Sequence, residues 1–243
     1  MLSVILPTYN EAGNIVPLIH ALREELAGVE FEIIVVDDDS PDGTWKLVET
    51  ESKSLPELKL LRRVGRRGLA SALRDGIRAS SGDLVGWMDC DFSTPPNVVP
   101  RLAAKISEGF DIAVASRYVP GGRDARAGSP WRRMASRVIV EFARAMLIRD
   151  FHDYTSGFVV ARREVLDSIP LRGDHGEYFM DFIVRALRSG RRIVEVPYVL
   201  VPRRHGESKT DSGFFRKGLK YLAMVGRLWL EARSSDAPAG IPR

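Results

Sequence analysis

The feature that most constrains this chain is the alternation of short apolar runs with segments of helical periodicity in its first half. Apolar runs of strand length lie at residues 2–6, 32–36, 58–61, 84–88 and 112–115. Between the first two, apolar residues recur at three- and four-residue steps, as on one face of a helix: Ile15, Leu18, Ile19, Leu22 and Leu26. This alternation predicts an α/β fold with a mostly parallel sheet flanked by helices.

The second half of the chain does not keep the regular alternation of strands and helices. Its apolar pattern predicts amphipathic helices over residues 130–148 and 213–232, a further helix over 177–187, and strands over 158–161 and 193–201. We therefore expect one α/β domain over residues 1–210, which includes an amphipathic interface helix at 130–150. A C-terminal amphipathic helix at 211–233 and a disordered tail at 234–243 should follow.

Composition and missing motifs exclude several classes of protein. The 243 residues include one cysteine, Cys90, so an internal disulfide framework and a cysteine-based zinc site are excluded. No run of about 18 uncharged apolar residues occurs, and the N-terminus does not resemble a signal peptide, so neither feature is expected. The absence of G-x-G-x-x-G, G-x-x-x-x-G-K-[ST] and G-x-S-x-G argues against dinucleotide oxidoreductases, P-loop NTPases and α/β hydrolases.

Basic residues are concentrated in two segments. Residues 114–150 and 201–233 each contain eight basic and three acidic residues, although the whole chain has a net charge of only +4. The rest of the chain is therefore net acidic. These two segments could face phosphates, anionic lipid or nucleic acid.

Polar clusters follow three of the expected strands: Thr8–Glu11, Asp37–Asp39 and Asp89–Asp91. In parallel sheets ligands bind outside the carboxyl ends of the strands, so we expect the three clusters to form one site. Two carboxylates at positions i and i+2, as in Asp89 and Asp91, can converge on Mg²⁺ or Mn²⁺ shared with substrate phosphates. A solvated turn that merely ends the strand is the plainer interpretation of such a pair.

The other two clusters suit a nucleotide. Three adjacent acids repel one another and no basic residue adjoins them in sequence, so ligands or donors should compensate Asp37, Asp38 and Asp39. Tyr9 offers a ring for stacking on a base, and Glu11 offers an acceptor. A turn with a helix cap would explain both clusters without function. Basic side chains also follow the fifth and last strands, where arginine suits bidentate phosphate contact: Arg117, Arg203, Arg204, His205 and Lys209.

Several runs together resemble the inverting glycosyltransferases of family 2, which have the GT-A fold. The runs are VILPTYNE at 4–11, VVDDDSPDGT at 35–44, and Gly68-Leu69 with Ala72. Three further runs point to one subgroup of this family: SRYVPGG at 116–122, TSGF at 155–158 and Arg203-x-x-Gly206-Glu207-Ser208-Lys209. With them the chain is similar, over about residues 2–210, to dolichol-phosphate mannose synthases and their bacterial polyprenol-phosphate counterparts.

The resemblance implies a role for each matching residue. The guanosine part of the donor would be held by Pro7, Tyr9, Glu11, Val36 and Asp38. Asp89, Cys90 and Asp91 would lie along the diphosphate, with Mg²⁺ or Mn²⁺ held by Asp91 and Asp89. Phosphates of donor and acceptor would be faced by Arg117, Arg203 and Lys209, and the lipid phosphate also by Arg132 and Ser136. The expected catalytic set is therefore Asp89, Asp91, Arg117, Arg203 and Lys209.

One position departs from the family pattern. Family members often carry a metal-ligating glutamine two residues after the second aspartate, whereas this chain has Ser93. A serine hydroxyl is a shorter and weaker ligand, so metal choice and sugar identity stay open.

The implied activity is transfer of mannose, with inversion, from GDP-mannose to dolichyl or polyprenyl monophosphate. The lipid acceptor implies a membrane surface as partner. We expect peripheral association with the cytoplasmic face of a membrane, unaided or through a membrane-protein subunit, because the two amphipathic helices have basic faces. Both helices could instead pack on the core with solvated outer faces.

Three alternatives are open at this point. A UDP-glucose-dependent lipid-phosphate glucosyltransferase would share most of these motifs. A non-catalytic nucleotide-sugar-binding subunit is disfavoured by the charged set. We expect no nucleic-acid partner, because acid-rich strand ends would repel its phosphates.

Overall fold

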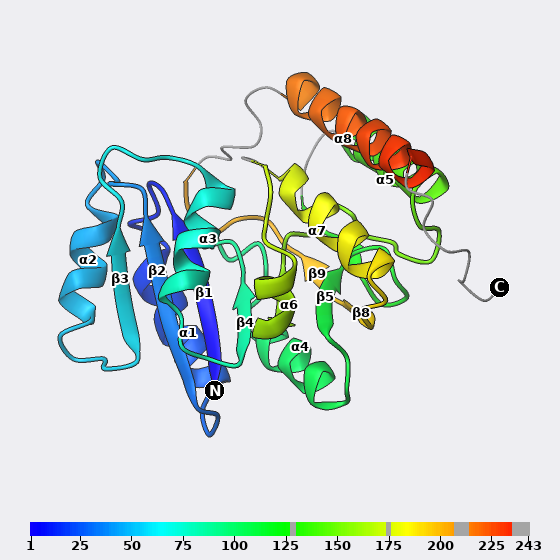
Figure 1. Ribbon diagram of the computed structural model, residues 1–243. Helices are drawn as coiled ribbons and strands as arrows, with labels where there is room; N and C mark the ends of the chain where they lie inside the picture. Colours follow the sequence, from blue (N-terminus) through cyan, green and yellow to red (C-terminus); the bar gives the residue numbers. More distant parts are fainter. Residues whose placement is uncertain (127–129, 174–175, 207–213, 235–243) are drawn as a thin grey trace.

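A computed structural model describes residues 1–126, 130–173, 176–206 and 214–234 (Figure 1). The strands are β1 (Leu2–Thr8), β2 (Phe31–Asp37), β3 (Leu58–Arg62), β4 (Leu84–Trp87), β5 (Ile112–Ser116), β6 (Arg123–Asp124), β7 (Val159–Arg162), β8 (Ile193–Pro197) and β9 (Val199–Leu200). The helices are α1 (Ile15–Glu25), α2 (Thr44–Glu51), α3 (Leu69–Ala79), α4 (Val98–Ser107), α5 (Pro130–Met146), α6 (Arg163–Ser168), α7 (Glu177–Arg188) and α8 (Phe214–Ser234).

Seven strands form one sheet in the order β3-β2-β1-β4-β7-β5-β8. Every pairing is parallel except those of β7, which runs antiparallel to both β4 and β5. The reversal brings the segment before β7, residues 153–158, to the edge where the parallel strands end. A separate two-stranded ribbon joins β6 to β9.

Helices cover both faces of the sheet (Figure 1). One buried cluster packs α1, α2 and α4 against side chains such as Leu6 and Val35. On the opposite face, side chains such as Ile5 and Val36 lie in a cluster with α3, α6 and α7. Successive residues of a strand point to opposite faces, which is why the buried strands are apolar at nearly every position. A sheet with two covered faces leaves its carboxyl edge as the place for polar side chains.

The C-terminal helix α8 lies along α5 and α7 at one end of the molecule (Figure 1). Val225 and Leu228 are fully buried and join the core cluster on the α7 face. Within the described parts of the chain, each helix is too short or too polar to cross a bilayer.

The predicted mostly parallel sheet, its flanking helices and the C-terminal helix are confirmed. The prediction of a single strand over residues 193–201 is wrong. Strand β8 ends at Pro197, which lacks an amide donor, and Val199 and Leu200 form β9, which pairs with β6. Helix α4 was not predicted from the sequence, although Val98, Val99, Leu102 and Ile106 share its buried face.

Candidate functional site

The candidate site lies at the carboxyl edge of the sheet. The register pairs Thr8 of β1 with Asp37 of β2, and Asp37 with Arg62 of β3, so these three strands end side by side. Strand β4 ends at Trp87, two residues before Asp89. The polar clusters expected to share one edge therefore follow neighbouring strands.

Asp91 is held by Arg203 and Ser93 at this edge. Arg203 donates to Oδ2 from Nη2 at 2.7 Å and from Nε at 3.2 Å, and the Ser93 amide donates to Oδ1 at 2.9 Å. Burial alone would raise the pKa of Asp91, but the hydrogen bonds from Ser93 and Arg203 outweigh it and lower that pKa. A carboxylate held ionised in this way can accept a cation or a donor without first losing a proton.

The neighbours of Asp91 differ in exposure. Asp89 is exposed, whereas Cys90 is buried and its Sγ lies 3.7 Å from the carbonyl oxygen of Pro7. Ser93 is buried, and its carbonyl accepts from the Val201 amide at 3.0 Å. Cys90 thus ties the loop after β4 to β1, and Ser93 ties it to the segment after β8.

Arg203 also links this loop to the loop after β1. Its Nη2 lies 3.8 Å from Glu11 Oε1, and Asn14 donates from Nδ2 to Glu11 Oε2 at 2.8 Å. The same amide group reaches the carbonyl oxygen of His205 at 3.2 Å. Asn14 precedes α1 without capping it through its side chain, so its amide serves these inter-loop contacts instead.

The three adjacent acids have separate protein partners. Asp37 is fully buried and accepts from Thr8 Oγ1 at 2.8 Å and from Ser40 Oγ at 2.6 Å. Asp38 accepts from Arg63 Nε at 2.7 Å, and Asp39 from Arg62 Nε at 2.7 Å. Donors within the protein therefore compensate the three acids, as the expectation of ligands or donors allowed: hydroxyl groups for Asp37, and two arginines at the end of β3 for Asp38 and Asp39.

A hollow of about 260 Å³ opens between the loops after β1, β2 and β3. Its lining consists of Tyr9, Asp38, Asp39, Gly65, Arg66 and Arg67. The Arg67 guanidinium carbon lies 3.6 Å from the centre of the Tyr9 ring. The Gly68 amide donates to Asp38 Oδ2 at 2.9 Å, so an aromatic ring, a carboxylate and guanidinium groups surround one hollow.

Arg117 has a dedicated partner on the other side of the edge. Asp153 is fully buried and accepts from Arg117 Nε at 2.8 Å and Nη2 at 2.6 Å, in a bidentate pair. Nη2 also donates to Thr155 Oγ1 at 2.6 Å. Burial alone would lower the pKa of Arg117, but Asp153 outweighs burial and raises it well above its usual value. Arg117 is thus fixed in direction as a permanent cation.

Asp89, Asp91 and Ser93 offer oxygen donors for a divalent metal after β4. Among the described residues, no group of three or more His, Cys, Asp or Glu side chains is arranged to hold a metal. Two carboxylates and the Ser93 hydroxyl are hard oxygen donors, which suit Mg²⁺ or Mn²⁺ when water and substrate phosphates complete the coordination. The residues therefore fit an ion that binds together with a diphosphate.

Three expected site residues cannot be placed. Lys209 lies outside the described residues, as do the side chains of Arg132 and Ser136. The remaining expected residues all belong to the carboxyl edge or its loops: Pro7, Tyr9, Glu11, Val36, Asp38, Asp89, Cys90, Asp91, Ser93, Arg117 and Arg203.

Comparison with known proteins decides the family. The family model of glycosyl transferase family 2 matches residues 3–169, which is more than half of the chain. This chain belongs to glycosyl transferase family 2. A dolichol-phosphate mannosyltransferase of Pyrococcus furiosus is 39% identical over 228 residues, covering 93% of this chain and 63% of that protein. A polyprenol monophosphomannose synthase of Mycolicibacterium smegmatis is 36% identical over 92% of this chain and 86% of its own length.

A third relative and a solved structure are also similar to this chain. An undecaprenyl-phosphate mannosyltransferase of Micrococcus luteus is 34% identical, over 86% of this chain and 87% of its own length. Glucosyl-3-phosphoglycerate synthase of Mycobacterium tuberculosis, in complex with Mn²⁺, uridine diphosphate and glucosyl-3-phosphoglycerate, has a TM-score of 0.70 at 22% identity. That alignment covers 94% of this chain and 79% of the synthase chain, and at this identity it shows the fold alone.

Sequence reasoning missed two groups in this family 2 site. Arg63 follows β3 directly, so the strand-end rule that identified the three acids applied to it as well. Asp153 precedes an antiparallel strand, and a rule written for parallel strands does not find it.

Proposed function

We propose that this chain transfers a mannosyl group from GDP-mannose to a dolichyl or polyprenyl monophosphate, with inversion at the anomeric carbon. The observation that carries the proposal is the identity of 34–39%, over 86–93% of this chain, with three relatives named as lipid-phosphate mannosyltransferases or synthases. The geometry supports it with an aromatic and acidic hollow beside a carboxylate–arginine edge.

Nucleotide binding is assigned to the first three strand ends. Tyr9 and Asp38 line the hollow that would take the base and ribose. We assign Pro7, Val36 and Cys90 to the adjoining strand ends, where Cys90 Sγ lies 3.7 Å from the Pro7 carbonyl oxygen. Arg203 lies between Glu11 and Asp91, with its Nη2 at 3.8 Å from Glu11 Oε1 and 2.7 Å from Asp91 Oδ2. A nucleoside diphosphate entering here would extend from Tyr9 toward Asp89 and Asp91.

The diphosphate end is assigned to Asp89, Asp91 and Ser93, together with Mg²⁺ or Mn²⁺. When bound, the metal neutralises charge that develops on the departing diphosphate. Arg203 donates to Asp91 and would be close enough to stabilise the same charge. A phosphate monoester acceptor is already anionic, so the protein's main task is to hold two phosphate groups together against their repulsion.

Acceptor phosphate binding is assigned to Arg117, Arg132, Ser136, Arg203 and Lys209. The Asp153 pair fixes the guanidinium of Arg117 and so would aim it before the acceptor arrives. Asp153 is therefore proposed as a positioning residue for Arg117.

Peripheral membrane attachment is assigned to α5 and α8. Large apolar side chains are exposed on both helices: Met134, Val138, Phe142, Leu219, Leu222 and Leu230. Arg137, Arg227 and Arg233 are also exposed there. An apolar surface with basic residues suits an anionic bilayer at the side of the molecule where the acceptor phosphate is proposed to bind.

Product analysis tests the proposed activity. Purified protein is incubated with Mn²⁺ or Mg²⁺, a short polyprenyl phosphate and either GDP-mannose or UDP-glucose, and the lipid is analysed by mass spectrometry. A mannosylated lipid phosphate is the expected product. A product from UDP-glucose alone would replace the donor assignment, and the absence of product with both donors would overturn the proposed function.

Two aspartate variants test the site. Asp89→Ala and Asp91→Ala should each lower turnover at least about 100-fold, because transition-state charge would lose its stabilisation. Asp83→Ala, at the opposite end of β4 and exposed, is the matched control and should keep turnover. Near wild-type turnover in a folded Asp89→Ala, Asp91→Ala double variant would rule out the assigned roles.

A further inference from the structure

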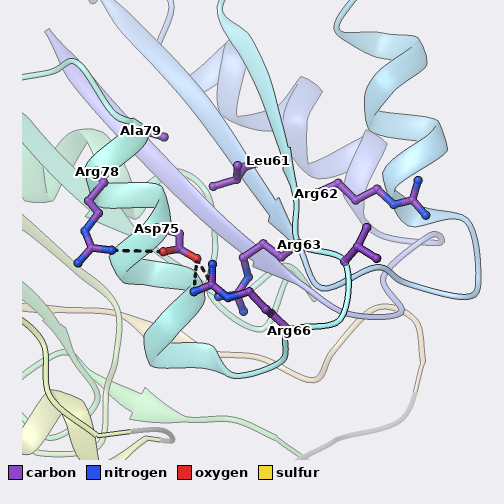
Figure 2. A pocket seen from close by; sticks show the side chains of 8 residues that line it. Leu61, Arg62, Arg63, Arg66, Asp75, Arg78 and Ala79 are labelled. Atoms are coloured by element: carbon purple, nitrogen blue, oxygen red, sulfur yellow. Dashed lines mark hydrogen bonds and ion pairs between the residues drawn. The ribbon is translucent and has the colours of Figure 1, made fainter.

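A second hollow lies between β3 and α3, beside the proposed nucleotide hollow. It measures about 510 Å³ and is lined by Leu61, Arg62, Arg63, Val64, Arg66, Asp75, Arg78 and Ala79 (Figure 2). That volume falls within the range of about 300–1,000 Å³ that small-molecule sites occupy. Nothing in the proposed transfer reaction uses Arg78, Leu61 or Ala79.

The lining of this β3–α3 hollow carries an excess of positive charge. Four of its eight residues are arginines and only Asp75 is acidic. Three guanidinium groups converge on that carboxylate, from Arg63 at 3.1 Å, Arg66 at 3.0 Å and Arg78 at 3.7 Å (Figure 2). Arg62 and Arg63 also pair with Asp39 and Asp38, so three carboxylates face four guanidinium groups, and the Arg78 contact with Asp75 is longer than a hydrogen bond. The cluster therefore favours an additional anion.

Arg63 gives the hollow a rigid wall. Its side chain is only 2% exposed and is held by Asp38, Asp75, Ser71 Oγ at 2.9 Å and the Gly68 carbonyl at 3.0 Å. Arg66 and Arg78 are 60% and 78% exposed, so they can turn toward an incoming ligand. A fixed guanidinium beside two adjustable ones lowers the ordering cost of binding an anion.

The chemistry of the lining selects the class of ligand. Arginine forks match the oxygens of phosphate in bidentate geometry. Leu61, Val64 and Ala79 supply an apolar wall beside them. We propose that the β3–α3 hollow binds a small phosphate-bearing anion at a site separate from the one assigned to the donor diphosphate.

Arg78→Ser tests the β3–α3 hollow specifically, because Arg78 lines this hollow and not the proposed nucleotide hollow, whereas Arg66 lines both. Binding of inorganic pyrophosphate to the whole chain is measured by calorimetry in EDTA, and circular dichroism checks the fold of each variant. We expect Arg78→Ser to weaken the Kd about fivefold or more, with Arg149→Ser, another exposed arginine, as the matched control at wild-type affinity.

Asp75→Asn gives a prediction of opposite sign. Removing the only carboxylate of the lining should tighten pyrophosphate binding about fivefold, which a merely structural ion cluster would not do. Comparing inorganic phosphate with guanosine monophosphate distinguishes recognition of the phosphate alone from recognition that includes the apolar wall.

Two results would overturn the proposal. In one, Arg78→Ser binds pyrophosphate within twofold of wild type. In the other, Arg203→Ser abolishes all binding, which would place the pyrophosphate at the edge that holds Asp91.

Discussion

Arg63 joins two acids that are far apart in the sequence. It bridges Asp38, at the end of β2, to Asp75 on α3, and all three side chains are largely buried. Replacing Arg63 by methionine would leave the Asp38 carboxylate without its cation and Asp75 with only the exposed Arg66 and Arg78, and breaking a buried pair costs about 3–5 kcal/mol. We expect Arg63→Met to lower the free energy of unfolding by about 3 kcal/mol in urea titrations followed by circular dichroism.

Its sequence neighbour provides the control. Arg62 is partly exposed and lies over the Trp45 ring with Asp39 as partner, so Arg62→Met should cost less than about 1 kcal/mol. Equal losses in the two variants would contradict the structural role assigned to Arg63.

Glu32 links stability to pH at the opposite end of the sheet. Burial alone would raise the pKa of Glu32, but donors from Lys59, Ser3 and the Ser81 amide outweigh it, so the pKa lies below the usual 4.5. Because the folded-state pKa is the lower one, this stabilisation is fully present above about pH 4.5 and is lost as the pH falls through the folded-state value.

Lys59→Met tests that linkage. Lys59 is half exposed, so its loss should lower the free energy of unfolding by at most about 1 kcal/mol near neutral pH. The difference from wild type should shrink as the pH falls through the lowered folded-state pKa of Glu32, where that carboxylate becomes protonated. Urea titrations near neutral pH and below the folded-state pKa of Glu32 measure this difference in the free energy of unfolding. A difference that grows on acidification would refute the stabilising role assigned to the Glu32–Lys59 pair.

Residues near strand ends were the most predictable part of the site. Asp38, Asp91 and Tyr9 follow apolar runs, and the rule that parallel strands end at one edge brought them together. Arg63 and Asp153 were missed because their importance depends on partners distant in sequence, Asp38 and Arg117. Periodicity locates a strand but contains no information about which strand lies beside it.

At the scale of elements, the antiparallel strand β7 shows the same limit. Its apolar residues predicted a strand but not its direction, because an apolar run does not indicate whether the strand pairs parallel or antiparallel with its neighbours. Its insertion between β4 and β5 positions Asp153 and Thr155 to bind Arg117. The antiparallel strand β7 therefore supplies the partners of Arg117 on the β5 side of the candidate site.

The packing of α8 against the start of α7 depends on one glycine. A Cβ atom at Gly176 would overlap the Tyr221 hydroxyl oxygen, whereas it would lie 3.4 Å from Cζ of that ring. Gly176→Ala should therefore cost about 1–3 kcal/mol of stability through overpacking. Tyr221→Phe removes the clashing oxygen and should restore part of the loss when the two changes are combined.

A double-mutant cycle measures this coupling. Thermal or urea unfolding of the two single variants and the double variant should give an interaction energy of about 1 kcal/mol, in the direction of rescue. Additive losses would mean that Tyr221 does not contact Gly176 in solution.

At the scale of the whole molecule, the assigned tasks lie on different parts of the sheet. Strands β1, β2 and β3 end around the hollow assigned to the nucleotide, while β5, β7 and β8 lie on the other side of β4. Asp89 and Asp91 follow β4, between these two groups of strands. Donor and acceptor would therefore meet at the strand end where charge stabilisation is proposed.

The proposed membrane attachment predicts a role for the exposed apolar residues of α5 and α8. Burying two such side chains in a bilayer contributes about 1.5–3 kcal/mol each when complete. Val138→Ser combined with Leu219→Ser, one change on each helix, should therefore reduce flotation with anionic vesicles by about tenfold or more. Val29→Ser combined with Leu47→Ser removes two exposed apolar residues elsewhere and should leave flotation unchanged.

Changing the salt concentration and the lipid charge measures how much the basic residues contribute to membrane binding. Flotation of the wild-type chain should fall as salt is raised and should be weaker with zwitterionic vesicles, because exposed arginines such as Arg137 and Arg227 attract anionic lipid. A wild-type chain that fails to float with anionic vesicles would argue against unaided attachment. Equal losses in the two double variants would show that general surface hydrophobicity, rather than the α5 and α8 residues, drives binding.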